Sequence, residues 1–177
     1  MHKLKLALFT TLLICALPLL AQAQKVNSTG GASPHETTSA VVDGNRVTLT
    51  YGRPYAKDRK IWGTLVPYGK VWRTGSDEAT TLITQKAIVI GDTTIPAGAY
   101  TLFTLPNADG TAKLIINKQL GQWGLQYDAK QDLARVDLKK TDLENPVDQF
   151  TMAISRTGEL KMMWESTQYS TTFTVQK

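Results

Sequence analysis

The sequence contains very little cysteine and histidine, the residues that most often supply nucleophiles and metal ligands. There is one cysteine, Cys15, and there are two histidines, His2 and His35, in the 177-residue chain. Cys15 and His2 lie in an N-terminal segment with the pattern of a cleaved export signal. The remaining chain then has no disulfide, no thiol nucleophile and no thiolate metal ligand. A single histidine also argues against a Ser-His-Asp triad and against a zinc site, which needs several such ligands.

The sequence also lacks the motifs of several common function classes. No segment matches the G-x-S-x-G turn of serine hydrolases, a phosphate-binding glycine loop or a dinucleotide-binding fingerprint. The formal net charge is +5, but the basic residues form no run and do not alternate with aromatic residues as they do in many nucleic-acid-binding proteins. We therefore expect no nucleic-acid partner, no cofactor and no bound metal.

Residues 1–23 are typical of an export signal. Lys3 and Lys5 give a positively charged start, an almost wholly apolar segment follows over Leu6–Leu20, and Ala21-Gln22-Ala23 is a small-x-small cleavage pattern. The apolar segment is about 15 residues long, shorter than the roughly 20 needed to span a bilayer. We predict a cleaved signal peptide over residues 1–23, a periplasmic or secreted protein, and no transmembrane segment after cleavage.

The rest of the chain is predicted to be a leader and one domain. Residues 24–35 are predicted to form a flexible leader, because this stretch is rich in serine, threonine, glycine and asparagine. Residues 36–177 contain no internal repeat, low-complexity block or linker. A chain of this length can bury roughly two-thirds of its unfolded surface in one core, which must hold the domain together without disulfides.

The domain has the hydrophobic pattern of β-strands. Val47, Leu49 and Tyr51 fall on one face of a predicted strand, and the intervening polar residues fall on the other. The turn Asp43-Gly44-Asn45 before them is a hairpin signal. Further strands are predicted over residues 38–42, 80–84, 87–90, 100–105, 113–117, 134–138, 149–155, 160–165 and 171–175.

No segment shows a sustained helical period, and residues 126–133 could form at most one or two helical turns. About ten short strands separated by glycine, proline and aspartate turns are typical of antiparallel sandwiches and barrels. We therefore predict an all-β fold with few or no helices, an antiparallel β-sandwich of jelly-roll-like type.

The richest candidate site is the turn-rich segment 70–80. If its first residues are extended, Arg73 shares a face with Val71, and a partly buried arginine needs a fixed partner. Glu78, across the predicted turn over residues 74–77, is the carboxylate that could pair with it. The two residues could form an ion pair that fixes the turn, or Arg73 could offer its guanidinium to a carboxylate, a phosphate or a sugar hydroxyl. Arg53, which the following proline holds extended, could face the same region.

Aromatic residues accompany this segment. Trp72 and Trp123 lie in turn-rich segments or next to glycine, where a ring beside polar groups can stack on a sugar or another flat ligand. The alternative is that these rings pack in the core or at its rim. The candidate ligand-binding residues are Arg53, Trp72, Arg73, Glu78, Trp123 and Tyr127.

Catalysis by carboxylates alone is the remaining enzymatic possibility. A glycosidase needs two carboxyl groups roughly 5–9.5 Å apart on either side of the sugar bond. Asp77 and Glu78 are adjacent, so on a strand they would point to opposite faces. Exposed acids of turns are the alternative interpretation, and we assign no catalytic residue.

Several ordered sequence blocks resemble a known family. They include Tyr51-Gly52-Arg53-Pro54, Val66-Pro67-Tyr68-Gly69, Val71-Trp72-Arg73-Thr74-Gly75, Glu78-Ala79-Thr80 and Gln122-Trp123-Gly124. By these blocks, and others spread over about residues 32–175, the chain resembles the domain of unknown function 2911 family, found among exported proteins of Bacteroidetes and related bacteria. The resemblance implies an exported, mostly β domain. It implies no activity, substrate or catalytic residue.

Three functional hypotheses follow. The leading one is an exported bacterial β-sandwich that binds a small polar or carbohydrate-like ligand, or part of a partner protein, at the Trp/Arg/Glu site. The second is a carboxylate-dependent hydrolase acting on glycans. The third is a structural envelope component that docks a protein partner. The sequence favours a binding protein over an enzyme.

Overall fold

The computed structural model describes residues 33–177, so the predicted signal peptide and most of the predicted leader lie outside the described residues. These residues contain nine β-strands and no α-helix, and none of their helical segments is long and apolar enough to cross a membrane. The elements are β1 (His35–Val42), β2 (Asn45–Gly52), β3 (Thr80–Thr84), β4 (Ile88–Ile90), β5 (Thr93–Ile95), β6 (Gly98–Pro106), β7 (Ala112–Asn117), the 3-10 helix η1 (Ala129–Gln131), β8 (Asp132–Ile154) and β9 (Glu159–Val175).

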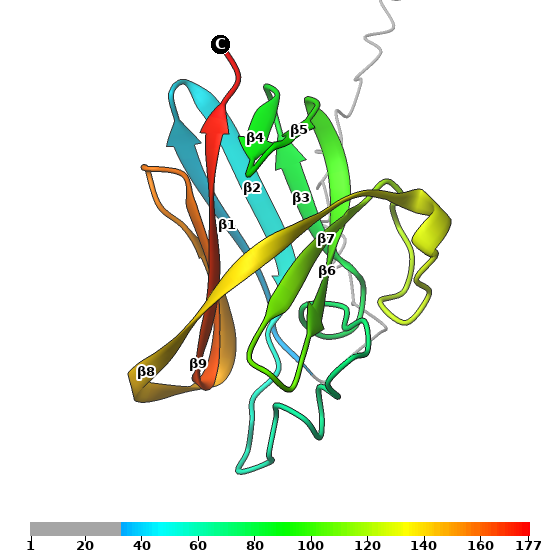
Figure 1. Cartoon of the computed structure of the whole chain (residues 1–177), viewed down its shortest axis with the longest axis vertical. Coiled ribbons are helices and arrows are strands. Elements are labelled where there is room, and N and C mark those ends of the chain that lie inside the picture. The colour runs from blue at the N-terminus through cyan, green and yellow to red at the C-terminus, as the bar shows by residue number, and fades with distance from the viewer. Residues whose placement is uncertain (1–32) are drawn as a thin grey trace, which may run out of the picture.

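All nine strands belong to one antiparallel sheet in the order β1-β2-β3-β6-β7-β8-β9-β4-β5. The predicted all-β, antiparallel fold is confirmed. The sheet does not close into a barrel, because β1 and β5 remain its two edges. In Figure 1, β8 crosses the front of the molecule while β1, β2 and β3 lie behind it, so the sheet folds over on itself like a sandwich.

The long strand β8 makes this fold possible by changing partners along its length. Residues 132–138 pair with β7, and residues 139–154 pair with β9. The sequence predicted two strands here, over residues 134–138 and 149–155, and they correspond to these two halves. The residues between them are mostly exposed. An exposed ribbon has no alternation of apolar and polar residues, so its strand character leaves no hydrophobic signal.

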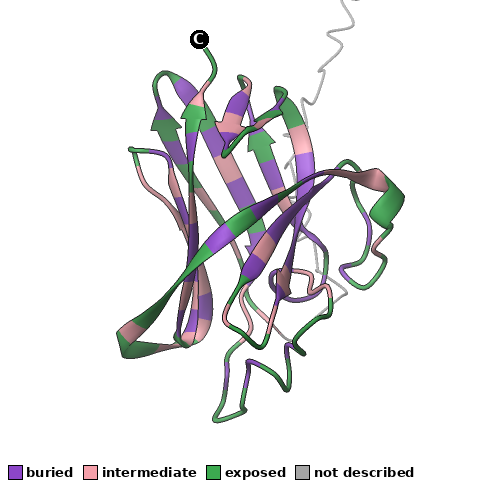
Figure 2. Ribbon diagram, in the orientation of Figure 1, coloured by how far each residue is buried: buried purple, intermediate pink, exposed green. Residues whose placement is uncertain are grey.

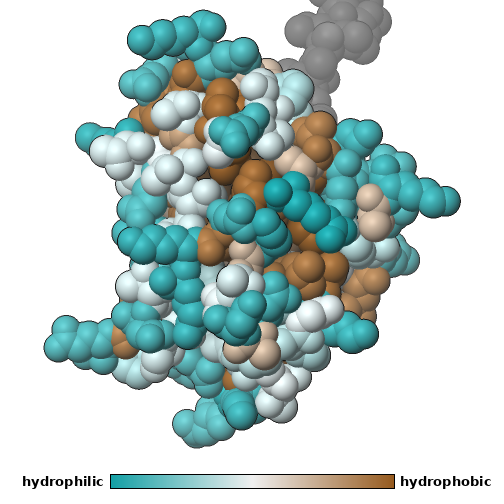
Figure 3. Space-filling view, in the orientation of Figure 1, coloured by the Kyte–Doolittle hydropathy of each residue, from teal (hydrophilic) through white to brown (hydrophobic). Residues whose placement is uncertain are grey.

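The core lies between the two folded-over parts of the sheet. Val47, Leu49 and Tyr51 of β2 are almost completely buried, as their alternation predicted. From the opposite side, β8 and β9 contribute Phe150 and Trp164, which are equally buried. Figure 2 shows buried positions recurring along β2, β3 and β9. Figure 3, which views the molecular surface from the same direction, shows hydrophobic residues near the middle and hydrophilic residues around the outline.

The loop between β2 and β3, residues 53–79, contains no regular strand but is fastened to the sheet. The backbone N–H of Trp72 donates to the carbonyl of Thr104 at 2.8 Å, and the N–H of Thr104 donates back at 2.8 Å. Thr104 lies on β6 beyond the last residue that pairs with β3, so the loop takes over the place that β3 leaves open. This pairing fixes the position of residues 73–77, which follow directly.

Candidate functional site

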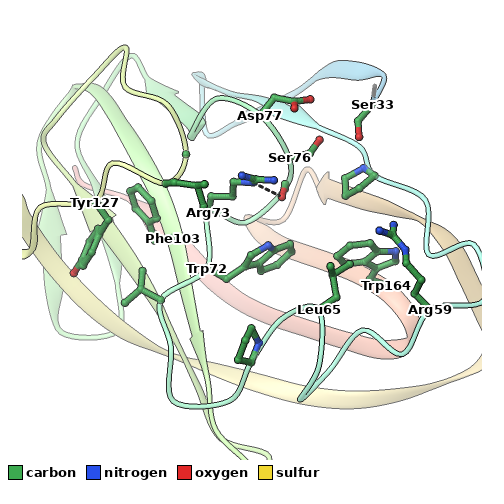
Figure 4. A pocket seen from close by; sticks show the side chains of 16 residues that line it. Ser33, Arg59, Leu65, Trp72, Arg73, Ser76, Asp77, Phe103, Tyr127 and Trp164 are labelled. Atoms are coloured by element: carbon green, nitrogen blue, oxygen red, sulfur yellow. Dashed lines mark hydrogen bonds between the residues drawn. The ribbon is translucent and has the colours of Figure 1, made fainter. Parts of the chain in front are cut away.

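A cavity of about 540 Å³ opens beside this fastened segment (Figure 4). Its wall comes from the β2–β3 loop and from the loop between β7 and β8, residues 118–128, and its floor comes from aromatic side chains of these loops and of the sheet. The volume lies within the roughly 300–1,000 Å³ that is usual for small-molecule sites. The cavity is therefore large enough to hold an organic ligand rather than a few water molecules.

The floor of the cavity is aromatic. The rings of Trp72 and Trp164 are stacked, with centroids 5.7 Å apart and planes 21° apart, and Phe103 lies against Tyr127 with centroids 4.8 Å apart. Phe150 contacts Trp72 edge-on at 5.1 Å and supports it from the core. Rings held on several sides keep their orientation, so this floor is formed before any ligand arrives.

Arg73 forms part of the polar wall, and Gly124 determines where its side chain runs. A Cβ atom at position 124 would collide with Arg73 Cδ and would lie 2.8 Å from Arg73 Cβ and 2.7 Å from the carbonyl oxygen of Asp77. The backbone N–H of Gly124 donates to that same carbonyl at 2.9 Å. Only glycine therefore lets the two loops approach closely enough for the Arg73 stem to pass between them.

The turn over residues 74–77 carries backbone strain. Thr74 has φ of 54° and Asp77 has φ of 65°, a region that non-glycine residues seldom occupy and that is an outlier for a β-branched residue. Two hydrogen bonds hold the turn in place: Thr74 Oγ1 lies 2.7 Å from Thr104 Oγ1, and Thr80 Oγ1 donates to the Thr74 carbonyl at 2.6 Å. Strain of this kind clusters at binding sites and active sites.

Two buried polar atoms of this turn have no hydrogen-bond partner among the described residues. Ser76 is 5% exposed and Asp77 is 8% exposed, and both line the cavity. Ser76 Oγ and Asp77 Oδ2 are the unpartnered atoms. A buried polar group without a partner is destabilising by about 1–3 kcal/mol, so natural proteins rarely keep one without a functional reason.

Glu78 is directed to a different partner from the one the sequence indicated. Its Oε2 lies 3.1 Å from Nε2 of His35, and the same nitrogen lies 3.8 Å from Asp77 Oδ2. The ion pair between Arg73 and Glu78, one of the two alternatives drawn from the sequence, is not formed. Glu78 is exposed and does not line the cavity. Trp72 and Thr80 both pair antiparallel with β6, so residues 73–79 bulge out between two segments that run in the same direction, an arrangement that sequence distance alone could not reveal.

Arg53 does not line the cavity either. Its Nε donates to the carbonyl of Phe150 at 3.1 Å, its Nη2 donates to Thr151 Oγ1 at 2.8 Å, and Nη1 forms an ion pair with Glu36. These contacts join the end of β2 to β1 and to β8. The guanidinium is thereby fully engaged in holding the sandwich together.

The two remaining aromatic candidates are placed differently from each other. Trp123 is 37% exposed, pairs through its backbone with Glu78, and lies outside the cavity. Tyr127 lines the cavity with its ring, while its hydroxyl donates to Asp132 Oδ2 at 2.6 Å and accepts from Arg135 at 2.7 Å. Burial and the hydrogen bond to Asp132 raise the pKa of Tyr127 to about 12, so the phenol stays neutral.

The structure thus brings Trp72, Arg73 and Tyr127 together at one cavity and places Arg53, Glu78 and Trp123 outside it. Other important residues of the cavity were not selected from the sequence. Ser76 and Asp77 lie within the candidate segment 70–80, but only the fold shows that they are buried. The lining also includes Arg59, Leu65, Phe103, Leu125 and Trp164.

The arrangement limits the chemistry that the cavity can perform. Asp77 is the only carboxylate among the described residues that line it, whereas a glycosidase needs two on opposite sides of the bond. Within residues 33–177 there is no group of three or more histidine, cysteine, aspartate or glutamate side chains placed to hold a metal ion. An aromatic floor with a cationic wall is instead suited to binding.

Comparison with known proteins gives one match. The model of the family described as "Protein of unknown function (DUF2911)" matches residues 33–173, which is most of the chain and nearly all of its described part. No curated protein and no solved structure matches this chain.

Proposed function

The chain belongs to the family described as protein of unknown function DUF2911, and from its own geometry we propose that it binds a small, partly apolar organic ligand in the cavity beside Trp72 and Arg73. Membership of this family transfers no activity, so the proposal depends on the cavity. A protein whose cavity has a ready-made aromatic floor and a polar wall has the two features that small-molecule sites combine.

The observation that carries the proposal is the guanidinium of Arg73 in the cavity wall, which lies beside a strained turn with buried polar atoms. Ser76 Oγ and Asp77 Oδ2 are buried without a hydrogen bond among the described residues, in a turn with backbone strain. The guanidinium of Arg73 makes a single hydrogen bond there, from Nε to the Gly75 carbonyl at 3.3 Å. The other N–H groups of this guanidinium have no hydrogen bond to the described residues, so they can donate to a ligand in the cavity.

The cavity is also preorganised. Trp72 is fixed by its backbone pairing with Thr104 and by the rings around it, and Gly124 is fixed by its hydrogen bond to Asp77. A ligand entering such a site has to order few protein groups. Most of its interaction energy then appears as affinity.

We further propose that binding takes place outside the cytoplasm. The support is the pattern at residues 1–23: the positive charges of Lys3 and Lys5, the apolar segment Leu6–Leu20 and the small residues Ala21 and Ala23. The fold of residues 33–177 needs no disulfide, because its apolar core is continuous from β1 to β9.

Two matched variants test the binding proposal. Leu125 and Leu120 are both exposed leucines of the same loop, at 76% and 52%, but only Leu125 lines the cavity. Leu125→Trp places a large ring over the opening, whereas Leu120→Trp makes the same change away from it. The two variants should have the same stability, because neither side chain is part of the core.

The assay is a screen of small ring-containing compounds by ligand-observed NMR on the purified protein, followed by titration of tryptophan fluorescence. The proposal predicts compounds that bind the unmodified protein and Leu120→Trp, and that lose at least about tenfold in affinity with Leu125→Trp. Tenfold corresponds to about 1.4 kcal/mol of lost contact, less than a fully buried leucine contributes. A screen without binders, or binders that are indifferent to Leu125→Trp, would refute it.

A further inference from the structure

Arg73 is a partly buried cation whose charge is not balanced by a protein carboxylate. No aspartate or glutamate oxygen of the described residues lies within 4.0 Å of its guanidinium, whereas Arg53, Arg135 and several lysines each have such a partner. Its only hydrogen bond to these residues uses Nε. The two terminal nitrogens, which form the fork that binds carboxylates in parallel, therefore have no partner within residues 33–177 and can bind a ligand.

The cavity as a whole carries an excess of one positive charge. The ionised side chains that line it are Arg59, Arg73 and Asp77, which is two cations and one anion. Asp77 does not neutralise Arg73: its Oδ2 lies 3.8 Å from His35 Nε2, and in Figure 4 its carboxylate points away from the Arg73 guanidinium. A ligand with one negative charge would bring the lining to electrical balance.

Arg59 lies at another part of the cavity and is already engaged. Its Nε donates to the carbonyl of Ala56 at 2.9 Å and its Nη2 donates to the carbonyl of Tyr55 at 2.6 Å. In Figure 4 the rings of Trp72 and Trp164 lie between Arg73 and Arg59. The apolar floor therefore begins next to the free guanidinium of Arg73.

The apolar part of the site extends to the opening. Leu65, from the β2–β3 loop, is 43% exposed, and Leu125, from the β7–β8 loop, is 76% exposed, yet both line the cavity. Exposed leucines at the mouth of a cavity with an aromatic floor would be covered by a ligand that is itself apolar. Such a ligand would bury these side chains together with the exposed part of Trp72.

We propose that the ligand of this cavity is an aromatic monocarboxylate, whose carboxylate is bound by the terminal nitrogens of Arg73 and whose ring lies against Trp72, the half-buried indole of the floor. This inference depends on the proposed binding function and adds the chemical class of the ligand. Charge-assisted hydrogen bonds to a carboxylate are about twice as strong as neutral ones, and a partly buried site screens them little. Arg73 is thus the specificity-determining residue.

Other ligand classes fit the cavity less well. A phosphate monoester brings up to two negative charges, which is more than the single excess charge of the lining, and no lysine is among the described residues of the wall. A neutral sugar could stack on the indoles but would leave the Arg73 guanidinium without a counter-charge. These two classes are therefore competitors that an experiment has to separate from the carboxylates.

The experiment uses pairs of compounds that differ only in charge. Phenylacetate, indole-3-acetate and 2-naphthoate are each compared with the corresponding primary amide by isothermal titration calorimetry on the purified protein. A carboxylate and its amide have nearly the same size and shape, so a difference in affinity reports on charge. We expect at least one carboxylate to bind about tenfold or more tightly than its amide, the effect of one charge-assisted contact.

Two substitutions assign the effect to Arg73. Arg73→Gln should reduce the affinity for the carboxylate to that of the amide, and Arg73→Lys, which keeps the charge but not the fork, should fall between them. Lys60→Gln is the control: it removes the same charge from an exposed residue of the same loop that does not line the cavity. It should leave both affinities unchanged, and circular dichroism should show all variants folded.

The outcomes separate this inference from the binding proposal. If carboxylates and amides bind equally and Leu125→Trp blocks both, the cavity binds ligands but the inference about charge is wrong. It is also wrong if Arg73→Gln and Lys60→Gln weaken carboxylate binding equally, or if phenyl phosphate or methyl glucoside binds more tightly than every carboxylate. If no compound of the set binds, and the screen with Leu125→Trp finds none either, both proposals fail.

Discussion

Replacing Gly124 by alanine tests how the cavity wall is built. The backbone at Gly124 is not in the left-handed region, so alanine is compatible with its conformation. Where that holds, a glycine-to-alanine change usually stabilises a protein by about 0.4–1 kcal/mol, because the unfolded chain loses freedom. Any destabilisation must therefore come from contacts of the new methyl group.

Those contacts are severe. The added Cβ would lie 2.7 Å from the Asp77 carbonyl oxygen and 2.8 Å from Arg73 Cβ, and neither atom is the free end of a flexible side chain. Overpacking of this kind is destabilising by about 1–3 kcal/mol. For a domain of this size, Gly124→Ala should lower the melting temperature by roughly 2–12 °C. It should also weaken ligand binding, since the two loops that form the cavity wall must separate.

A double mutant identifies the cause. Arg73→Ala removes the Cδ contact, so Gly124→Ala should be less destabilising in the Arg73→Ala background than alone, by about 0.5 kcal/mol or more. Urea denaturation followed by circular dichroism gives the four free energies of the cycle. The reasoning is refuted if Gly124→Ala is as stable as the unmodified protein, or if the two substitutions are simply additive.

Two further predictions concern residues beside the site. Arg53→Gln should lower the free energy of unfolding by about 1–3 kcal/mol, because it removes the ion pair with Glu36 and the hydrogen bonds to β8. The same substitution should change ligand affinity less than about twofold. A loss of affinity at unchanged stability would instead place Arg53 in the site. Burial and the hydrogen bond to Asp132 raise the pKa of Tyr127 to about 12 from its ordinary 10.0, so the stabilisation it provides is complete below pH 10 and is lost between pH 10 and pH 12. Urea denaturation across this window should show a smaller loss of stability for Tyr127→Phe than for the unmodified protein, and equal losses would contradict the prediction.

The fold could be predicted from the sequence wherever one face of a strand is buried. In β2 the alternation of Val47, Leu49 and Tyr51 predicted both the strand and the face that packs in the core. The turn Asp43-Gly44-Asn45 before it predicted the hairpin with β1. The middle of β8 could not be predicted as strand, because residues 140–149 are largely exposed on both faces. The three-residue strand β5 is too short to show a period.

The site could be predicted only in part, for a related reason. Trp72, Arg73 and Tyr127 stood out by residue type, and the structure places all three at the cavity. The partners of charged residues did not follow from sequence distance. Glu78 contacts His35 on β1, and Arg53 contacts β8, nearly a hundred positions further along the chain. Such partners are determined by how the sheet folds over.

The most direct test of the central claim is a crystal structure of the protein with the tightest-binding carboxylate of the panel. The account predicts that the compound lies on Trp72, with its carboxylate oxygens at hydrogen-bonding distance, about 2.7–2.9 Å, from the terminal nitrogens of Arg73. A compound bound at another surface, with the cavity beside Arg73 free of it, would contradict the account.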